Sequence, residues 1–372
     1  MISEWTWPAY VAILLGGVLF AVLFAPLLAL QSRRFGRLTL SRTIAVGLFS
    51  VYGVALVAYT LLPLPEQDWC SLHPSPPVQW RPLHSLDDIA NAGSATAFAV
   101  LQVVFNVALF VPWGAFWRRY AGWGVGRTVL SGFIVSLLIE STQGTGLWGL
   151  YDCAYRVADV DDLLTNTTGA LLGAALAPLL LSWVPRADVD TRRRGEPRPL
   201  TTSRRLASAL IDVATVTILG VVITIVYRAI VLYGLERPLP DEGDWTAQLP
   251  WETLAFVLVL ALPVLLGEPT PGQRATWLRP EYPDARPGRR VVRLLAGAGG
   301  WALITLVGTL PPVATSELAG VPPFVAGAWA VVSAVLIVRD PTHRGPSFRW
   351  AGVALVDSRQ PRSQAATHQS TP

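Results

Sequence analysis

Polar and ionisable side chains interrupt the apolar stretches in the first half of the chain. A charge at the depth of lipid tails costs about 2.5 to 3.5 kcal/mol on insertion scales, so such residues usually line an interior site or bind one another. Carboxylate, amide and guanidinium groups together can bind a polar ligand or move a proton. We therefore expect the functional site among Asn106, Glu140, Gln143, Arg156, Asp159, Asp162 and Asn166.

The apolar composition of the chain indicates that membrane-spanning helices carry these residues. The chain has 372 residues, of which 52% are hydrophobic and 15% charged, and its mean hydropathy is +0.44. A soluble globular domain of this size is normally more polar. We therefore predict an all-α fold, a polytopic integral membrane protein. The pI of about 9.3 does not indicate binding of nucleic acid, because the basic residues follow the membrane topology.

Nine apolar runs are long enough to cross a hydrocarbon core of about 30 Å, which takes about 20 helical residues. They cover residues 8–30, 43–63, 96–117, 128–148, 160–184, 206–228, 251–267, 294–314 and 322–338. Arginine is concentrated in alternate connecting segments, and the positive-inside rule places these segments in the cytoplasm. The amino terminus is then expected outside and the carboxyl terminus inside, which agrees with an odd number of spans.

A polar linker, rich in proline and arginine, separates five predicted spans from four. We expect a first membrane domain at residues 1–184, a cytoplasmic basic linker at 185–203 and a second membrane domain at 204–356. The last residues, 357–372, are polar and have no periodicity, so they are expected to be disordered.

The predicted helices bring three of the polar residues to one level. At a rise of about 1.5 Å per residue, Glu140 lies roughly 20 Å above the inner surface at Arg127, and Asn106 roughly 18 Å above Arg118. By the same count, Asn166 lies roughly 9 Å below the outer surface. All three residues are therefore expected in the outer half of the membrane.

One face of the fifth predicted helix is polar at its outer end and small at its inner end. Its members follow one another at intervals of 3, 4, 3 and 4 residues, and they are Asp159, Asp162, Asn166, Gly169 and Gly173. Such spacing places them on a single stripe. The two glycines allow a neighbouring helix to approach closely, so we assign them to helix packing.

The polar cluster has two interpretations. It can be a buried hydrogen-bonded network that only fixes helix packing. Alternatively, it forms a pocket open to the outer leaflet, in which Arg156 binds a phosphate or carboxylate and Glu140 or Asp162 acts as base or acceptor. In either case Arg156, from an outer loop, is the expected cation to neutralise Glu140 or Asp162.

Four separated blocks in the first half resemble the VanZ family. They read Asn106-Val-Ala-Leu-Phe-Val-Pro112-Trp-Gly114, Glu140-Ser-Thr-Gln143, Arg156-Val-Ala-Asp159-Val-Asp-Asp162, and Asn166-Thr-Thr-Gly169 followed by Gly173. The resemblance covers roughly residues 40–185. It implies a multi-pass protein of the bacterial cytoplasmic membrane, in a family whose founder is linked to low-level resistance to teicoplanin-type glycopeptides and has no settled biochemical activity. The partners it implies are membrane lipids and a cell-wall precursor or glycopeptide.

The second half resembles the RDD family over roughly residues 200–356. The blocks are Arg205-Leu-Ala-Ser-Ala-Leu-Ile-Asp212, Gly267-Glu-Pro-Thr-Pro-Gly272 and Arg289-Arg290-Val-Val-Arg293. That family is named for an arginine and two aspartates and is often assigned to transport. Phe348 stands where the second aspartate is expected, so the module is degenerate and can serve as a scaffold. Arg205 can equally be a snorkelling interfacial residue and Asp212 a packed acid paired with it.

Cys70 and Cys153 are the only cysteines, and both fall in predicted outer loops. The environment there permits a disulfide, but pairing also requires Cα atoms within about 7 Å. A bridge and two free thiols both remain open from the sequence.

Three classes of function fit these features. The preferred one is a binding or remodelling protein that changes how envelope precursors or lipophilic glycopeptides meet the outer leaflet. The second is an intramembrane enzyme acting on a lipid-linked phosphate or ester, and the third an ion or proton transporter that uses Asp212. The sequence contains no phosphate-binding loop, dinucleotide fingerprint or helical metal motif, so we expect no cofactor and no metal. It does not indicate an oligomeric state.

Overall fold

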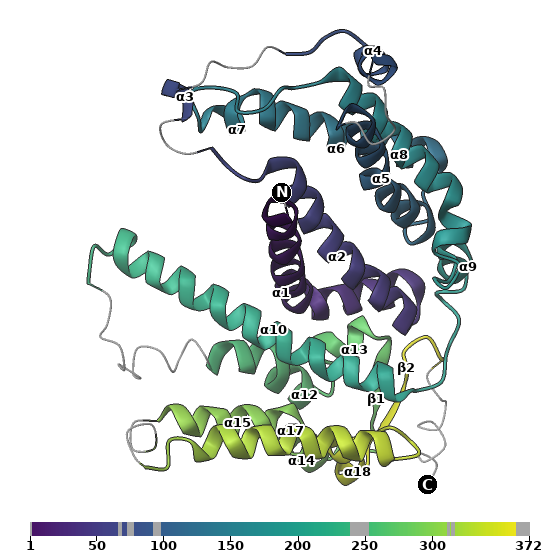
Figure 1. Cartoon of the computed structure of the whole chain (residues 1–372). Coiled ribbons are helices and arrows are strands. Elements are labelled where there is room, and N and C mark those ends of the chain that lie inside the picture. The colour runs from purple at the N-terminus through teal and green to yellow at the C-terminus, as the bar shows by residue number, and fades with distance from the viewer. Residues whose placement is uncertain are drawn as a thin grey trace. The chain divides into compact units, whose positions relative to one another are not determined.

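The computed structural model describes residues 2–65, 69–72, 78–91, 98–238, 253–310, 313 and 317–361. Within these ranges the chain is mostly helical, as predicted (Figure 1). It packs into two compact units. The first unit comprises residues 1–24 and 39–190, and the second comprises residues 25–38 and 191–372.

Seven helices in the described ranges are long and apolar enough to cross a membrane. They are Ala9–Phe35, Leu40–Leu61, Phe98–Arg119, Val125–Gly144, Val160–Leu180, Thr202–Gly234 and Val321–Arg339. The chain is therefore a multi-pass membrane protein.

The other two of the nine predicted spans are not straight membrane-length helices. Thr253–Leu266 is a shorter apolar helix, and its rise of about 21 Å falls short of a 30 Å core. The other span is a pair of helices, Pro287–Leu295 and Gly299–Gly308, bent by 58°. The glycines between Leu295 and Trp301 explain the bend, because glycine is a poor helix former.

Five long helices build the first unit, and short ones connect them. The long helices are α1 (Ile2–Phe35, up to residue 24), α2 (Leu40–Leu61), α5 (Phe98–Arg119), α6 (Val125–Gly144) and α8 (Val160–Leu180). The short ones are α3 (Trp69–Leu72), α4 (His84–Asn91), α7 (Gly146–Gly149) and α9 (Ala187–Arg192, up to residue 190). Leu56, Phe110 and Ala170 form a buried core where α2, α5 and α8 meet. Figure 1 shows α5, α6 and α8 packed side by side.

Glycines hold α5 and α8 in close contact. A Cβ atom added to Gly169 would lie 2.1 Å from the carbonyl oxygen of Val107, and one added to Gly173 would lie 2.1 Å from that of Val111. On the opposite helix, Gly114 meets the α8 backbone in the same way. Only glycine fits at these positions, because any side chain would collide with backbone atoms.

The second unit contains α10 (Thr202–Ala229), continued by η1 (Ile230–Gly234), and two helices that lie side by side, α15 (Ala298–Thr309) and α17 (Val321–Arg339) (Figure 1). Shorter helices complete it, and these are η2 (Val257–Ala261), α12 (Leu262–Leu266), α13 (Pro271–Ala275), α14 (Pro287–Leu295) and α18 (Gly345–Ala351).

A small antiparallel sheet joins β1 (Leu278–Glu281) to β2 (Ala354–Asp357) in the second unit. The all-α prediction did not include it, because four-residue strands are too short for alternation to be distinguished from other patterns. The sheet also corrects the start of the predicted disordered tail. Asp357 lies in β2, where its buried carboxylate accepts a hydrogen bond from Arg204 at 2.9 Å. Residues 362–372 of that tail lie outside the described residues.

Candidate functional site

The first unit encloses a cavity of about 600 Å³, which we call the first-unit cavity. Its walls come from α2, α5, α6, the segment before α8 and the first turns of α8. Six of the seven polar residues singled out in the sequence line it, and these are Asn106, Glu140, Gln143, Arg156, Asp162 and Asn166. The helices predicted to converge at one level therefore do bring these six side chains together.

Asp159 acts at the edge of the site through its backbone. Its own N–H donates to Glu140 Oε2 at 2.9 Å, which holds the Glu140 carboxylate in place. The Asp159 side chain caps α8 and accepts a hydrogen bond from the Asp161 N–H at 2.8 Å. Burial raises the pKa of the Asp159 carboxyl, and the bond from Asp161 opposes that shift. Asp159 is thus a positioning residue outside the cavity lining.

The three amide side chains all donate to acceptors within the first unit. Asn106 Nδ2 donates to Asp162 Oδ1 at 2.5 Å, and Asn166 Nδ2 donates to Ser136 Oγ at 2.9 Å. Gln143 Nε2 donates to the carbonyl oxygen of Thr60 at 2.6 Å. These bonds fix the amide groups, so that their oxygen atoms are left as acceptors.

Arg156 does not form the expected ion pair with Glu140 or Asp162. Its guanidinium donates instead to the carbonyl oxygens of Thr60 at 3.0 Å and Leu62 at 2.6 Å. Both carbonyls lie at the carboxyl end of α2, where the last turn has no intrahelical donors and carries partial negative charge. Arg156 is therefore bound by the end of α2, and not by the carboxylate that the sequence led us to expect.

Hydrogen-bond acceptors are in excess around the first-unit cavity. Within the described part of the chain, several oxygens of lining residues receive no hydrogen bond, among them Glu140 Oε1, Asp162 Oδ2, Asn106 Oδ1, Gln143 Oε1 and Asn166 Oδ1. The lining also holds two carboxylates against one guanidinium. The cavity consequently favours a ligand that donates hydrogen bonds and is not an anion.

The remaining wall of the cavity is apolar and follows α5. Phe98, Leu101 and Val104 line it, and the same residues are exposed on the protein surface, Phe98 to 77%. The cavity is therefore amphipathic, with polar groups at one side and, at the other, an apolar wall that continues onto the exposed surface of α5.

Asp161, in the first turn of α8, lies close to the site but was not predicted from the sequence. Its buried carboxylate accepts hydrogen bonds from the N–H groups of Leu83 and Ser85 and from the Ser85 hydroxyl, at 2.5 to 2.7 Å. Asp161 falls off the stripe that begins at Asp159, so the spacing did not single it out. The run of acids at 159–162 was the available signal.

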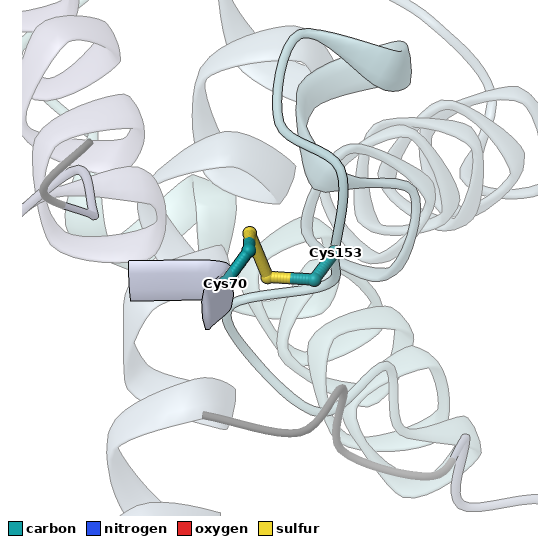
Figure 2. The surroundings of a disulfide bond; sticks show 2 residues. All are labelled: Cys70 and Cys153. Atoms are coloured by element: carbon teal, nitrogen blue, oxygen red, sulfur yellow. A yellow bond between two sulfur atoms is a disulfide. The ribbon is translucent and has the colours of Figure 1, made fainter. Parts of the chain in front are cut away.

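A disulfide joins Cys70 in α3 to Cys153 in the segment before α8, with Cα atoms 5.6 Å apart (Figure 2). Arg156 follows Cys153 by three residues. The bridge thus restrains the segment that brings Arg156 to the first-unit cavity.

The second-unit residues Arg205 and Asp212 are both buried, but they do not pair with each other within ion-pair distance in the described part of the chain. Asp212 accepts hydrogen bonds from the Thr270 hydroxyl and the Gly272 N–H, both at 2.7 Å. Arg205 donates to Ser347 Oγ at 3.2 Å, and its guanidinium lies 5.2 Å from the centre of the Phe348 ring.

Fold and cavity together define a multi-pass membrane protein with an amphipathic cavity among the helices of its first unit. Residues 49–181 match the family model described as VanZ/LLP1, which confirms the VanZ-like resemblance and spans every residue that lines the first-unit cavity. No curated protein and no solved structure matches the chain. The resemblance of the second half to the RDD family stays a prediction.

Proposed function

We propose that the protein binds the hydrogen-bond-donating headgroup of an amphiphilic envelope molecule in the first-unit cavity. The observation that carries this proposal is the combination of unpaired acceptor oxygens with an apolar wall that continues onto the lipid-facing surface. The VanZ-like match adds a relation to glycopeptide resistance. The candidate ligands are a lipid-linked cell-wall precursor and a lipophilic glycopeptide.

The chemistry of the lining favours sugar hydroxyls, amide N–H groups and ammonium groups. Each can donate to Glu140 Oε1, Asp162 Oδ2 or the amide oxygens of the lining. A phosphate or carboxylate fits poorly, because Arg156 is already bound to two carbonyls and the two carboxylates repel an anion. This replaces the expectation that Arg156 binds an anionic headgroup.

Ligand size and access agree with this function. Pockets for small molecules usually measure about 300–1,000 Å³, and the first-unit cavity of about 600 Å³ falls in that range. It accommodates a headgroup but not a whole glycopeptide. An acyl chain would stay along Phe98, Leu101 and Val104, in contact with lipid.

The disulfide and the arginine distribution both support an assignment of the cavity to the outer side of the membrane. Disulfides form in oxidising compartments, and the Cys70–Cys153 bridge lies next to the segment that carries Arg156. The arginine-rich segments are assigned to the opposite side. We therefore propose that the cavity lies in the outer leaflet of the bacterial plasma membrane.

The test compares two charge-neutralising changes in full-length protein in lipid nanodiscs. Glu140→Gln keeps an acceptor for the Asp159 N–H but removes the free carboxylate oxygen, and Glu196→Gln makes the same change at an exposed residue of the second unit. Binding of teicoplanin and of a polyprenyl-linked disaccharide peptide is measured by calorimetry. We expect Glu140→Gln to weaken binding at least tenfold, and Glu196→Gln to leave it unchanged.

A steric variant makes the test independent of the polar network. Ala108 lines the cavity and forms none of its hydrogen bonds, so Ala108→Trp should block binding while leaving the melting temperature near that of the wild type. Wild-type affinity in both Glu140→Gln and Ala108→Trp, or no binding of either probe by the wild type, would contradict the proposal. Mass spectrometry of the bound probe separates binding from turnover.

A further inference from the structure

The second unit contains a smaller cavity, of about 160 Å³, between α10, α14, α17 and α18, which we call the second-unit cavity. Three charged residues line it, and all three are buried: Arg205, Asp212 and Arg293. Two guanidinium groups therefore face one carboxylate at this site.

Asp212 does not neutralise either arginine directly. Both of its oxygens bind the amino-terminal turn of α13, through the Thr270 hydroxyl and the Gly272 N–H. A Cβ atom at Gly272 would lie 2.0 Å from the carbonyl oxygen of Ser208, so this turn packs directly against α10. Asp212 is thus committed to holding α13, and no ion pair joins it to Arg205 or Arg293 in the described part of the chain.

The two arginines bind only neutral groups. Arg293 donates to Gln273 Oε1 at 2.9 Å and to the Tyr282 hydroxyl, while Arg205 donates to Ser347 Oγ at 3.2 Å. Both guanidinium carbons lie near the same ring, 5.2 Å for Arg205 and 4.9 Å for Arg293 from the centre of Phe348. A cation–π contact offsets only part of the cost of burying a guanidinium without a counter-ion.

Unused donors remain around the second-unit cavity. Arg205 Nη1 makes no hydrogen bond with the described residues, and the buried Ser333 hydroxyl likewise has no partner among them. Both residues line the cavity. The rest of the lining is mainly apolar, with Leu260, Val264 and Ile337 among its members.

We propose that the second-unit cavity binds a small organic anion, a carboxylate attached to a short apolar body. The carboxylate accepts hydrogen bonds from Arg205 and Ser333, and it supplies a counter-ion for the guanidinium groups of Arg205 and Arg293. A protein cavity of about 150 Å³ is large enough to bind benzene, so the volume of about 160 Å³ fits a ligand the size of benzoate. This site is independent of the function proposed for the first unit.

The decisive experiment places the carboxylate on the protein. Phe348 is 1% exposed, and its ring centre lies 5.2 Å from the guanidinium carbon of Arg205 and 4.9 Å from that of Arg293. Phe348→Asp supplies an internal anion, whereas Phe348→Asn makes nearly the same change in shape without the charge. Benzoate is titrated into each full-length protein in nanodiscs, in a chloride-free sulfonate buffer, and followed by calorimetry and thermal unfolding. We expect the wild type and Phe348→Asn to bind, and Phe348→Asp to bind at least tenfold more weakly.

A second variant and two competing probes complete the design. Ala209 lines the cavity, and Ala209→Phe should abolish benzoate binding by filling the space while both arginines are retained. Benzamide, which has the same shape but no charge, and sodium chloride should each fail to displace benzoate. Displacement by either one, equal affinities in Phe348→Asp and Phe348→Asn, benzoate binding by Ala209→Phe, or the absence of saturable binding in the wild type would overturn the proposal.

Discussion

Asp161 shows how much of the first unit depends on one carboxylate. It receives three hydrogen bonds from Leu83 and Ser85, and so ties the start of α4 to the first turn of α8. Its neighbour Asp159 receives one, from the Asp161 N–H, in an ordinary capping interaction. Hydrogen bonds to charged groups contribute more than neutral ones, about 1.5–3 kcal/mol each. Asp159 and Asp161, two residues apart, therefore differ sharply in structural importance.

Replacement of Asp161 by alanine should lower the free energy of unfolding by about 3 kcal/mol, because several donors lose a charged acceptor. Asp159→Ala, which removes only the cap, should cost about 1 kcal/mol. Thermal unfolding of both variants tests the difference, and hydrogen exchange should show faster exchange in residues 83–91 for Asp161→Ala alone. Equal losses in the two variants would show that the hydrogen bonds from Leu83 and Ser85 to Asp161 add no stability.

At the residue scale, the sequence identified which residues belong to the site but not which atoms pair. The cost of polar groups in lipid picked out Glu140, Asp162 and Asn166, and the structure places them in one cavity. The partner of Arg156 was missed because it consists of backbone carbonyls at the end of α2. Side-chain patterns carry no information about such groups until the helix end is known.

Among the elements, α5 and α8 have the closest packing described for the first unit. The small-residue spacing of Gly169 and Gly173 was visible in the sequence, whereas the identity of the opposing backbone, Val107 and Val111, required the fold. The β1–β2 sheet could not be predicted from the sequence, since its strands are too short to leave a periodic signal.

Gly173→Ala should separate α5 from α8, because the new methyl group would lie 2.1 Å from a carbonyl oxygen that cannot rotate away. Overpacking of this kind costs roughly 1–3 kcal/mol. Gly53→Ala in α2 is the matched control, since nothing lies within 4 Å of its added Cβ; it should leave stability unchanged or raise it by up to about 1 kcal/mol. Melting temperatures of the two purified variants decide the matter, and a stable Gly173→Ala protein would refute the close packing.

For the whole molecule, the disulfide closes a loop between cysteines 83 residues apart. Removal of a bridge across a loop of this length costs about 2–4 kcal/mol. The double variant Cys70→Ser, Cys153→Ser should therefore unfold at lower temperature and bind headgroup probes more weakly, because the segment carrying Arg156 is released.

Alkylation reports both the bond and the side of the membrane. In wild-type cells a membrane-impermeant maleimide should label the protein only after reduction. The single variant Cys70→Ser leaves Cys153 as a free thiol, which the same reagent should reach from outside without permeabilisation. Labelling that requires permeabilised cells would place this end of the first unit in the cytoplasm and reverse the proposed orientation.

The first helix has a consequence for any attempt to separate the two halves. Residues 25–38 pack with the second unit although the linker lies far beyond them in the chain. There the Ser32 carbonyl accepts from the Trp277 indole N–H at 3.0 Å, and the Gly36 carbonyl accepts from Arg359 at 3.2 Å. A fragment starting at residue 191 would lack both acceptors. Split-gene versions of this protein therefore need the leading helix supplied in trans or grafted onto the later piece.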